Sequence, residues 1–477
     1  MERRNALCFF QIIFPNDAAF SRSKHYRKEI SMYTQDQIIT AMPAAGYTVV
    51  LGAAGSGKTA AALKRAAFFA AKPEQPRVLL VTWNRLLASQ LLTQSAKETL
   101  LRRLTVEGFP DFALRSLKYY GAIAGTGRIL DAHRRAALIR QALQKCQAAH
   151  PEEPLFFMPP QFYDEEIRIM QQTDLCYGTH AADDSGSGYQ KRLRRCTEEV
   201  RRNYQEIRTF GGWRFDAEDL PALLCRAASG TKTPLRYQHI IADDAQDFSP
   251  AMLHALFGAL APEGSMTLFA DPAQRITGSR YHWQDAGLPV GAVYELSGSR
   301  TFPADIRHFL AAIRSGDETA ESAEMPALRL YADEAHELAD TAELAVRLSR
   351  SAPAAVLCRS TKDLLRVREQ LLKNGHESVI LHGDTAAGVR EPAVYLSTYR
   401  DARGLEFAHV LLPFLSAEKL PHPAALLRAR TAAEAVANER SLFYCAASRA
   451  AESLHLSASG VPSQMLSEGL PALALSI

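Results

Sequence analysis

The chain has 477 residues, which is enough for about three domains of ordinary size. Its 55 Lys and Arg residues nearly balance its 52 Asp and Glu residues, and 47% of the residues are hydrophobic. This composition excludes a disordered, collagen-like or coiled-coil chain. The formal net charge of +3 also excludes a uniformly basic nucleic-acid coat, although basic side chains can still gather on one face.

Cysteine spacing and hydropathy exclude two further classes. The 7 cysteines are scattered and form no CxxC pair, so we expect neither a disulfide framework nor a zinc or iron–sulfur site. No apolar run approaches the ~18 residues that a membrane span needs. We therefore expect a cytoplasmic protein without a membrane-spanning segment, in which residues 1–31 form a loosely attached N-terminal extension.

Buried strands alternate with helices in the first part of the chain. Continuous apolar runs, which are typical of strands buried on both faces, occupy 47–51, 77–83, 239–242 and 266–270. Helical patterns begin at Thr59 and cover 85–96. This alternation predicts an α/β fold with a parallel sheet. We assign residues 32–96 and 215–290 to this first domain.

Residues 97–214 have a different character, because their pattern is mostly helical with few β-branched runs. We expect them to form a helical insertion in the first domain. A second α/β pattern follows in residues 291–477. Its predicted strands are 354–358, 378–381, 393–397 and 409–414. Ser360 or Thr361 is predicted to cap a helix that runs through Lys373 and is stopped by Gly375.

A phosphate-binding loop follows the first predicted strand. It reads Gly52, Ala53, Ala54, Gly55, Ser56, Gly57, Lys58 and Thr59, which fits the GxxxxGK[ST] pattern between a strand and a helix. Its glycines let backbone N–H groups turn toward a phosphate, and the helix N-terminus adds partial positive charge. We expect Lys58 to contact the β and γ phosphates and the Thr59 hydroxyl to hold Mg²⁺.

Two carboxylates follow the third predicted strand, at Asp243 and Asp244. The carboxyl end of a parallel strand is where catalytic groups and metals gather in open α/β sheets. We expect Asp243 to hold the metal and Asp244 to orient or deprotonate the attacking water. Alone, such a pair is more often a loop start or a helix cap. The glycine loop makes the functional interpretation the stronger one.

The order of several motifs resembles that of superfamily 1 DNA helicases of the UvrD/Rep type. The motifs are Gly52–Thr59, the run DDAQD at 243–247 and GLEF at 404–407. The resemblance covers nearly the whole chain. It implies two RecA-like parallel-sheet motor domains, with a helical insertion in the first and ATP in the cleft between them.

Several single residues also match functional positions of the family's motifs. Gln37 resembles the adenine-reading glutamine, Gln274 the glutamine that couples nucleotide to DNA, and Glu406 the glutamate that holds the ribose. Arg300 and Arg449 resemble the two arginines that reach the γ phosphate. The segment Thr82, Trp83 and Asn84 resembles the first motif that contacts a single strand, with Trp83 offering a stacking face for a base.

The sequence departs from the family pattern at several positions. Asp244 stands where relatives usually have Glu, and it is one methylene shorter. The residues that would stack on adenine are replaced by Ala60 and Ser299, and Arg400 and Arg403 replace the usual His and Lys. Only about 100 residues separate Arg300 from the GLEF motif. The resemblance is therefore to a compact form that lacks the large fourth subdomain.

These patterns favour an ATP- and Mg²⁺-dependent translocase or helicase that acts on single-stranded or partly duplex DNA. The resemblance implies a 3′-to-5′ direction and a role in DNA repair, recombination or defence. Basic residues cluster in 102–135 and 190–208, which predicts salt-dependent phosphate contacts there. The sequence leaves open RNA as the substrate. It also leaves open a degenerate helicase that serves as a nucleotide- and strand-binding scaffold for a partner such as a nuclease.

Overall fold

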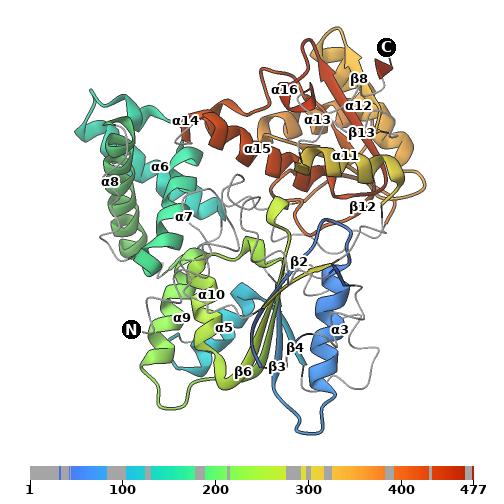
Figure 1. Cartoon of the computed structure of the whole chain (residues 1–477). Coiled ribbons are helices and arrows are strands. Elements are labelled where there is room, and N and C mark those ends of the chain that lie inside the picture. The colour runs from blue at the N-terminus through green and yellow to red at the C-terminus, as the bar shows by residue number, and fades with distance from the viewer. Residues whose placement is uncertain are drawn as a thin grey trace.

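The computed structural model describes most of the chain. The described residues are 32–33, 42, 45–82, 104–123, 130, 132–177, 188–211, 215–274, 292–296, 302–315, 325–381, 391–428, 432–467 and 475–476. They form two α/β domains and a helical part that lies beside both (Figure 1). No helix among them is long and apolar enough to cross a membrane.

The first domain contains a seven-stranded sheet in which every pairing is parallel. The strands, in spatial order, are β1 (Met32–Tyr33), β7 (Ala292–Leu296), β2 (Gly46–Leu51), β6 (Leu260–Ala270), β5 (Tyr237–Asp243), β3 (Val78–Thr82) and β4 (Leu104–Gly108). This confirms the predicted α/β class and the four predicted strands. The predicted helix 85–96 lies outside the described residues.

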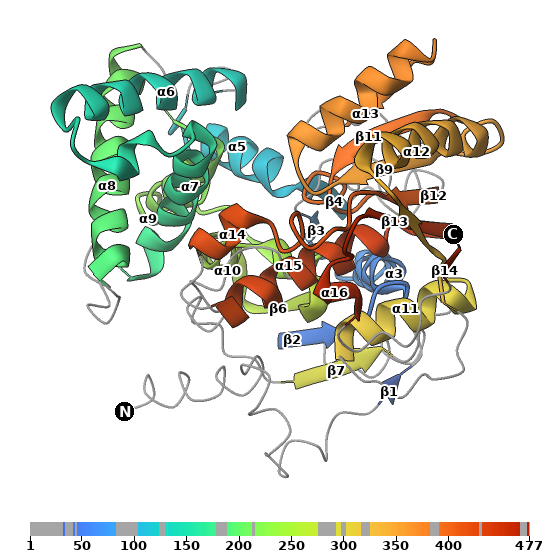
Figure 2. The same ribbon diagram turned by 90° about the horizontal axis from the view of Figure 1, so that it is seen from above.

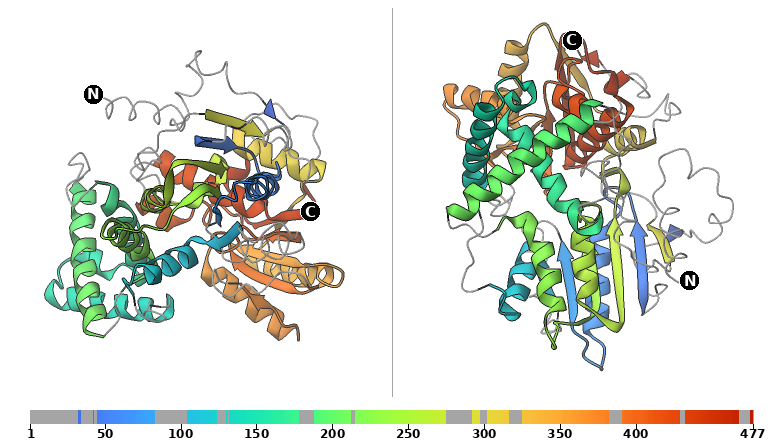
Figure 3. Two further views of the ribbon diagram at one scale, coloured as in Figure 1. Left: turned by 90° about the horizontal axis from the view of Figure 1, so that it is seen from below. Right: turned by 90° about the vertical axis from the view of Figure 1, so that its left-hand side faces the viewer.

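Alternating side chains of this sheet enter two separate cores. On β2, Val50 packs with α3 (Lys58–Ala70), whereas Val49 faces the opposite layer. That layer contains α5 (Phe109–Tyr119), α9 (Leu220–Ser229) and α10 (Pro250–Gly258). The right panel of Figure 3 shows the strands of this sheet below the second domain. A parallel sheet covered on both faces explains why the strands read as continuous apolar runs.

The second domain repeats this architecture with another seven-stranded parallel sheet. Its order is β10 (Val379–Ile380), β11 (Val394–Thr398), β9 (Ala354–Cys358), β12 (Phe407–Leu412), β13 (Ala450–Ser459), β8 (Leu328–Tyr331) and β14 (Leu475–Ser476). The helices are α11 (Ala304–Ser315), α12 (Glu334–Leu348), α13 (Thr361–Lys373), α14 (Pro423–Arg428), α15 (Ala432–Ala447) and α16 (Gln464–Ser467). Ser360 caps α13 as predicted, because its hydroxyl accepts from the Asp363 N–H at 3.1 Å.

The helical insertion consists of α6 (Ala132–Ala149), α7 (Pro160–Tyr177) and α8 (Gly188–Phe210), with the short turn η2 (Pro154–Phe157) between α6 and α7. The three helices share an apolar core that includes Ile139, Tyr163 and Tyr204. Figures 1 and 2 both place α14 of the second domain on the side that faces this insertion. The chain returns to the first domain through the turn η4 (Ala217–Asp219).

Two expected boundaries differ from the structure. The helical insertion was expected to begin at residue 97, but β4 pairs with β3 in the first sheet and α5 packs into its core. Likewise β7 was expected in the second domain, because 291–477 was assigned to it, but β7 pairs with β2. Both strands lie far in sequence from their neighbours, and local hydrophobic pattern carries no information on which strand pairs with which.

Candidate nucleotide site

The glycine loop joins β2 to α3 in the way the motif predicts. Gly55 and Gly57 have φ values of 70° and 81°, a left-handed conformation that favours glycine. Gly57 is the N-cap of α3, so Lys58 is the first helical residue. The Lys58 ammonium donates to the carbonyls of Gly52 and Ala53, both at 2.9 Å. With its side chain 8% exposed, Lys58 is a buried cation inside its own loop.

The acidic pair lies at the end of β5, beside β3, where Asp243 is the partner of Thr82. Asp243 is fully buried, and neither carboxylate oxygen meets a donor at hydrogen-bonding distance among the described residues, although the nearby Thr59 hydroxyl and Lys58 ammonium act to lower its pKa. Burial and then the charge of Asp244 raise the pKa of Asp243 well above its ordinary range. A buried carboxylate without a donor is costly. This site is therefore suited to a cation.

Asp244 has φ 52° and ψ 41°, a left-handed conformation that Asp tolerates better than most residues. The turn η5 (Ala245–Asp247) follows it. The Gln246 amide donates to Asp244 Oδ1 at 3.1 Å, and its Oε1 accepts from the backbone N–H of Asp271 at 2.9 Å. Gln246 thus links the Asp244 carboxylate to the backbone of Asp271, which follows β6. Sequence reasoning did not identify this contact.

Several side chains bridge the two domains near the loop. Gln274, in the turn η6 (Pro272–Gln274), accepts from the Arg449 guanidinium at 3.3 Å. Arg403 pairs with Asp247 at 2.8 Å. The structure therefore brings Gln274 of the first domain to Arg449 of the second, and the run 243–247 to Arg403.

A third bridge joins the glycine loop to Tyr444 and Asp271, two residues outside the predicted set. The Ala54 N–H donates to the Tyr444 hydroxyl at 3.2 Å, and that hydroxyl donates to Asp271 Oδ2 at 3.4 Å. The same Asp271 oxygen lies 3.9 Å from the Lys58 ammonium. Tyr444 lies five residues before Arg449 in the segment 439–450, and no sequence pattern predicts its contact with the glycine loop.

The remaining predicted residues are placed as follows. Thr82 is fully buried at the end of β3, and Glu406 is exposed on the turn before β12. Thr59 is half-buried and Ala60 is exposed at the start of α3. The predicted residues outside the described part of the chain are Gln37, Trp83, Asn84 and Arg300. Their roles stay predictions.

Known proteins resemble this chain over both domains. Residues 33–290, more than half of the chain, match the family described as UvrD/REP helicase N-terminal domain. Residues 376–460 match the UvrD-like helicase C-terminal domain.

The chain belongs to the UvrD/Rep helicase family.

The two parallel sheets are consistent with the RecA-like domains of such helicases, as the sequence predicted. Among solved structures, the C-terminal domain of a "possible DNA helicase" from Lactobacillus plantarum WCFS1 is 21% identical. It covers 37% of this chain and 99% of its own, with a TM-score of 0.28. No curated protein matches the chain significantly.

The basic residues predicted to contact DNA differ in their surroundings in the structure. Some are tied into ion pairs: Arg115 with Glu107 at 2.8 Å, and the buried Arg135 and Arg208 both with Asp216 at 2.7 Å. Several further basic residues are exposed on α8. This α8 basic stripe consists of the exposed Lys191, Arg194, Arg195 and Arg202. Their spacing of three, four and seven residues places them on one side of the helix.

A cavity of about 290 Å³ lies away from the glycine loop, at the N-terminal end of α13. Three of its lining cations are ion-paired: Arg359 with Glu439 at 2.6 Å, Arg366 with Glu334 at 2.6 Å and Lys419 with Asp363 at 3.0 Å. The nucleotide site is identified by its motifs and buried charges, not by this cavity.

Proposed function

We propose that the helicase hydrolyses ATP in the cleft between its two RecA-like domains and uses this to move along single-stranded DNA. One observation carries the proposal: the glycine loop and Gln274 of the first domain contact Tyr444 and Arg449 of the second. A motor needs such a cleft, because opening and closing it changes the relative position of two strand-binding domains.

The chain's own residues have separate tasks in this proposal. The loop N–H groups and Lys58 bind the phosphates and Asp244 orients the attacking water. Arg449 and Arg300 offset the charge that develops on the transferred phosphoryl group. On binding, Lys58 exchanges the carbonyls of Gly52 and Ala53 for phosphate oxygens.

Mg²⁺ fits the residues present. Asp243 supplies a buried carboxylate without a hydrogen-bond partner among the described residues, and Thr59 supplies a hydroxyl nearby. Such hard oxygen ligands, completed by phosphates and water, are what Mg²⁺ prefers. We infer that Asp243 and Thr59 hold the ion, which when bound neutralises charge on the β and γ phosphates.

DNA contact is proposed for Thr82, Trp83 and Asn84 and for the helical insertion. The α8 basic stripe supports the second part, because four exposed cations on one helix face suit sequence-independent phosphate contacts. The 3′-to-5′ direction, the unwinding of partly duplex DNA, and a cytoplasmic role in repair, recombination or defence rest on the family resemblance.

The decisive experiment measures ATP hydrolysis with and without a single-stranded oligonucleotide. We expect hydrolysis that needs Mg²⁺ and rises on adding DNA, and a loss of about 100-fold or more for Lys58→Ala. The matched control is Lys64→Ala on the same helix α3, outside the loop, which should keep the wild-type rate. An inactive wild-type protein, or a fully active Lys58→Ala variant, would overturn the proposal.

A second candidate is a scaffold that binds nucleotide and strands for a partner such as a nuclease, without efficient turnover. The shorter Asp244 and the exposed Ala60, which provides no stacking face for adenine, favour it. Multiple turnovers by the unmodified chain would exclude this candidate, and faster turnover by Asp244→Glu would support it. Comparing DNA and RNA oligonucleotides as ATPase activators identifies the substrate.

A further inference from the structure

We propose that Tyr444 is a positioning residue that couples closure of the two domains to the orientation of Asp244. This inference rests on the proposed ATP hydrolysis and adds to it a residue outside the predicted set. Its basis is a continuous series of contacts that begins in the second domain, crosses the cleft at the glycine loop, and ends at the carboxylate expected to orient water.

The first step crosses the cleft. Tyr444 lies on α15 and is 2% exposed. Its hydroxyl accepts from the Ala54 N–H at 3.2 Å. The Ala54 side chain is also buried in the same apolar cluster as Ile306 and Phe309 of the second domain. The glycine loop is thus attached to the other domain by a hydrogen bond and by packing.

The second step joins this contact to Lys58 and Asp271. The Tyr444 hydroxyl donates to Asp271 Oδ2 at 3.4 Å, and Asp271 lies fully buried at the end of β6. The same oxygen lies 3.9 Å from Lys58 Nζ. Because Asp271 faces both groups, a shift of α15 against the loop changes the surroundings of the Lys58 ammonium.

The third step reaches the acidic pair. The Asp271 N–H donates to Gln246 at 2.9 Å, and the Gln246 amide donates to Asp244 at 3.1 Å. Gln246 is 1% exposed. Water therefore has little access to these bonds, and hydrogen bonds in a low-dielectric interior are stronger and more directional. A displacement of Tyr444 therefore shifts Asp244 through the two intervening residues, Asp271 and Gln246.

This series gives Tyr444 a different task from Arg449 and Gln274. Those two side chains meet each other across the cleft at 3.3 Å, whereas the Tyr444 hydroxyl contacts the loop backbone itself. When the domains separate, the Ala54 N–H and Asp271 lose this partner together. The loop and the water-orienting carboxylate are then positioned together only in the closed arrangement.

The test uses Tyr444→Phe in the full-length chain, which removes only the hydroxyl. The matched control is Tyr399→Phe, because Tyr399 is 1% exposed in the same domain and its hydroxyl has no hydrogen-bond partner among the described residues. We expect kcat for DNA-stimulated ATP hydrolysis to fall about tenfold in Tyr444→Phe, with KM for ATP nearly unchanged. The control should keep the wild-type kcat.

A second readout does not depend on hydrolysis. Hydrogen–deuterium exchange of peptides that contain Ala54, measured without nucleotide, should be faster in Tyr444→Phe than in the wild type and in Tyr399→Phe. Wild-type kcat together with wild-type exchange in Tyr444→Phe would overturn the inference. An inactive wild-type protein would contradict the proposed function instead, while the exchange result would still test the Tyr444 contact.

A further variant covers the case in which Tyr444→Phe does not fold. Gln246→Met removes the link between Asp271 and Asp244 at similar side-chain volume and leaves the cleft contact in place. We expect a lowered kcat with unchanged exchange of the Ala54 peptides. A wild-type kcat in Gln246→Met would show that Asp244 does not depend on this series, and the proposed coupling would be wrong.

Discussion

His239 is a buried histidine at the start of the strand that carries the acidic pair. Its ring stacks on Phe69 of α3 with centroids 3.5 Å apart, and its Nδ1 lies 2.7 Å from the Ser265 hydroxyl. Burial first, and then the charges of Lys72 and Arg65, lower the pKa of His239 to about 4. The folded protein therefore resists protonation at this site.

A pH dependence of stability follows from this shift. Between pH 6.5, the ordinary pKa, and about 4, the unfolded chain binds a proton at His239 that the folded chain does not. The stabilising contribution is complete above pH 6.5 and is lost as the pH falls. Between pH 7.5 and 5 the loss is about 2 kcal/mol in the free energy of unfolding.

Urea unfolding of the wild type and of His239→Asn at both pH values measures this difference. The variant should lose about 2 kcal/mol less than the wild type over that interval. His376→Asn is the matched control, because His376 is exposed whereas His239 is buried. Equal pH dependence of wild type and His239→Asn would contradict the prediction.

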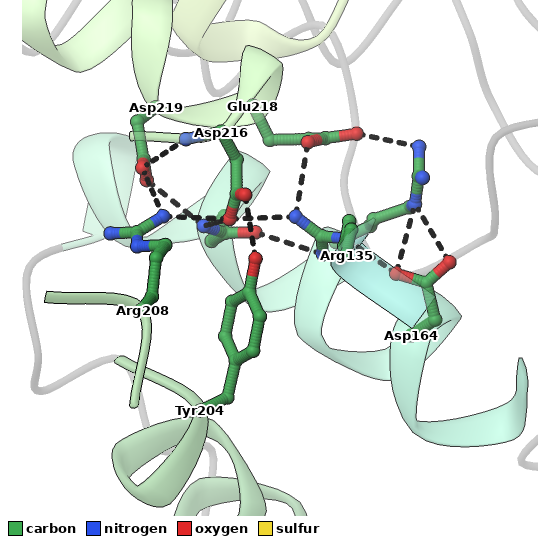
Figure 4. Close-up of polar contacts among 9 residues, drawn as sticks. Arg135, Asp164, Tyr204, Arg208, Asp216, Glu218 and Asp219 are labelled. Carbon is green, nitrogen blue, oxygen red and sulfur yellow. Dashed lines mark hydrogen bonds and ion pairs between the residues drawn. The ribbon is translucent and has the colours of Figure 1, made fainter. Parts of the chain in front are cut away.

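At the scale of elements, the helical insertion is fastened to the first domain by a buried ionic network (Figure 4). Asp216, just before η4, pairs with Arg135 of α6 and Arg208 of α8, both at 2.7 Å, and accepts from the Tyr204 hydroxyl at 2.6 Å. Glu218 extends the network to Arg168 of α7 at 2.6 Å. All three insertion helices therefore meet one short return segment.

Removing the charge of Asp216 should destabilise the protein strongly. The Asp216→Asn variant leaves Arg135 and Arg208 buried with fewer counter-charges, which costs about 3 kcal/mol or more. The matched control is Glu206→Gln, because Glu206 is 60% exposed and its pair with Lys145 is a surface contact. That change should cost less than about 0.5 kcal/mol.

Chemical denaturation monitored by circular dichroism gives both values. A loss for Asp216→Asn as small as that for Glu206→Gln would show that the network adds little stability. The network also changes the sequence-based view of Arg135 and Arg208, which were counted among the phosphate-contacting residues. Their charges are instead paired with Asp216 in the interior of the protein.

At the scale of the whole molecule, the three parts are joined by polar contacts between charged residues. Arg400 pairs with Glu165 of α7 at 2.8 Å, and Arg403 pairs with Asp247 of the first domain at 2.8 Å. These arginines are two of the departures from the family pattern. In this chain, Arg400 joins the second domain to the insertion, and Arg403 joins the second domain to the first.

The α8 basic stripe makes a prediction about the whole complex with DNA. The log of the association constant for a single-stranded oligonucleotide falls with the log of the salt concentration. Replacing Arg194, Arg195 and Arg202 together with Gln should make this slope less steep by about 2. Arg192→Gln is the matched control on the same helix, because Arg192 is paired with Glu153 at 2.8 Å. Fluorescence anisotropy titrations over a range of salt concentrations measure the slopes.

An unchanged slope in the triple variant would place the DNA elsewhere. A slope lowered equally by Arg192→Gln alone would show that the ion pair with Glu153 does not keep that residue from the phosphates. Neither variant changes the contacts proposed for Trp83 and Asn84, so weak binding should persist in both.

The sequence by itself determined the fold class, the strands of both sheets that read as apolar runs, and the glycine loop. These features depend on local pattern: hydrophobic period, turn residues and a motif whose parts are adjacent in the chain. The family resemblance supplied Gln274 and Arg449, and the structure brings them together at 3.3 Å.

Only the tertiary structure decided which strands complete the first sheet and which charges are free to meet a ligand. The pairing of β4 with β3 and of β7 with β2 joins segments that are distant in sequence. The contact of Tyr444 with Ala54 spans 390 residues. Burial and ion pairing arise from such long-range packing. A count of charges along the chain therefore could not distinguish Arg135, which is buried and paired with Asp216, from the exposed Arg194.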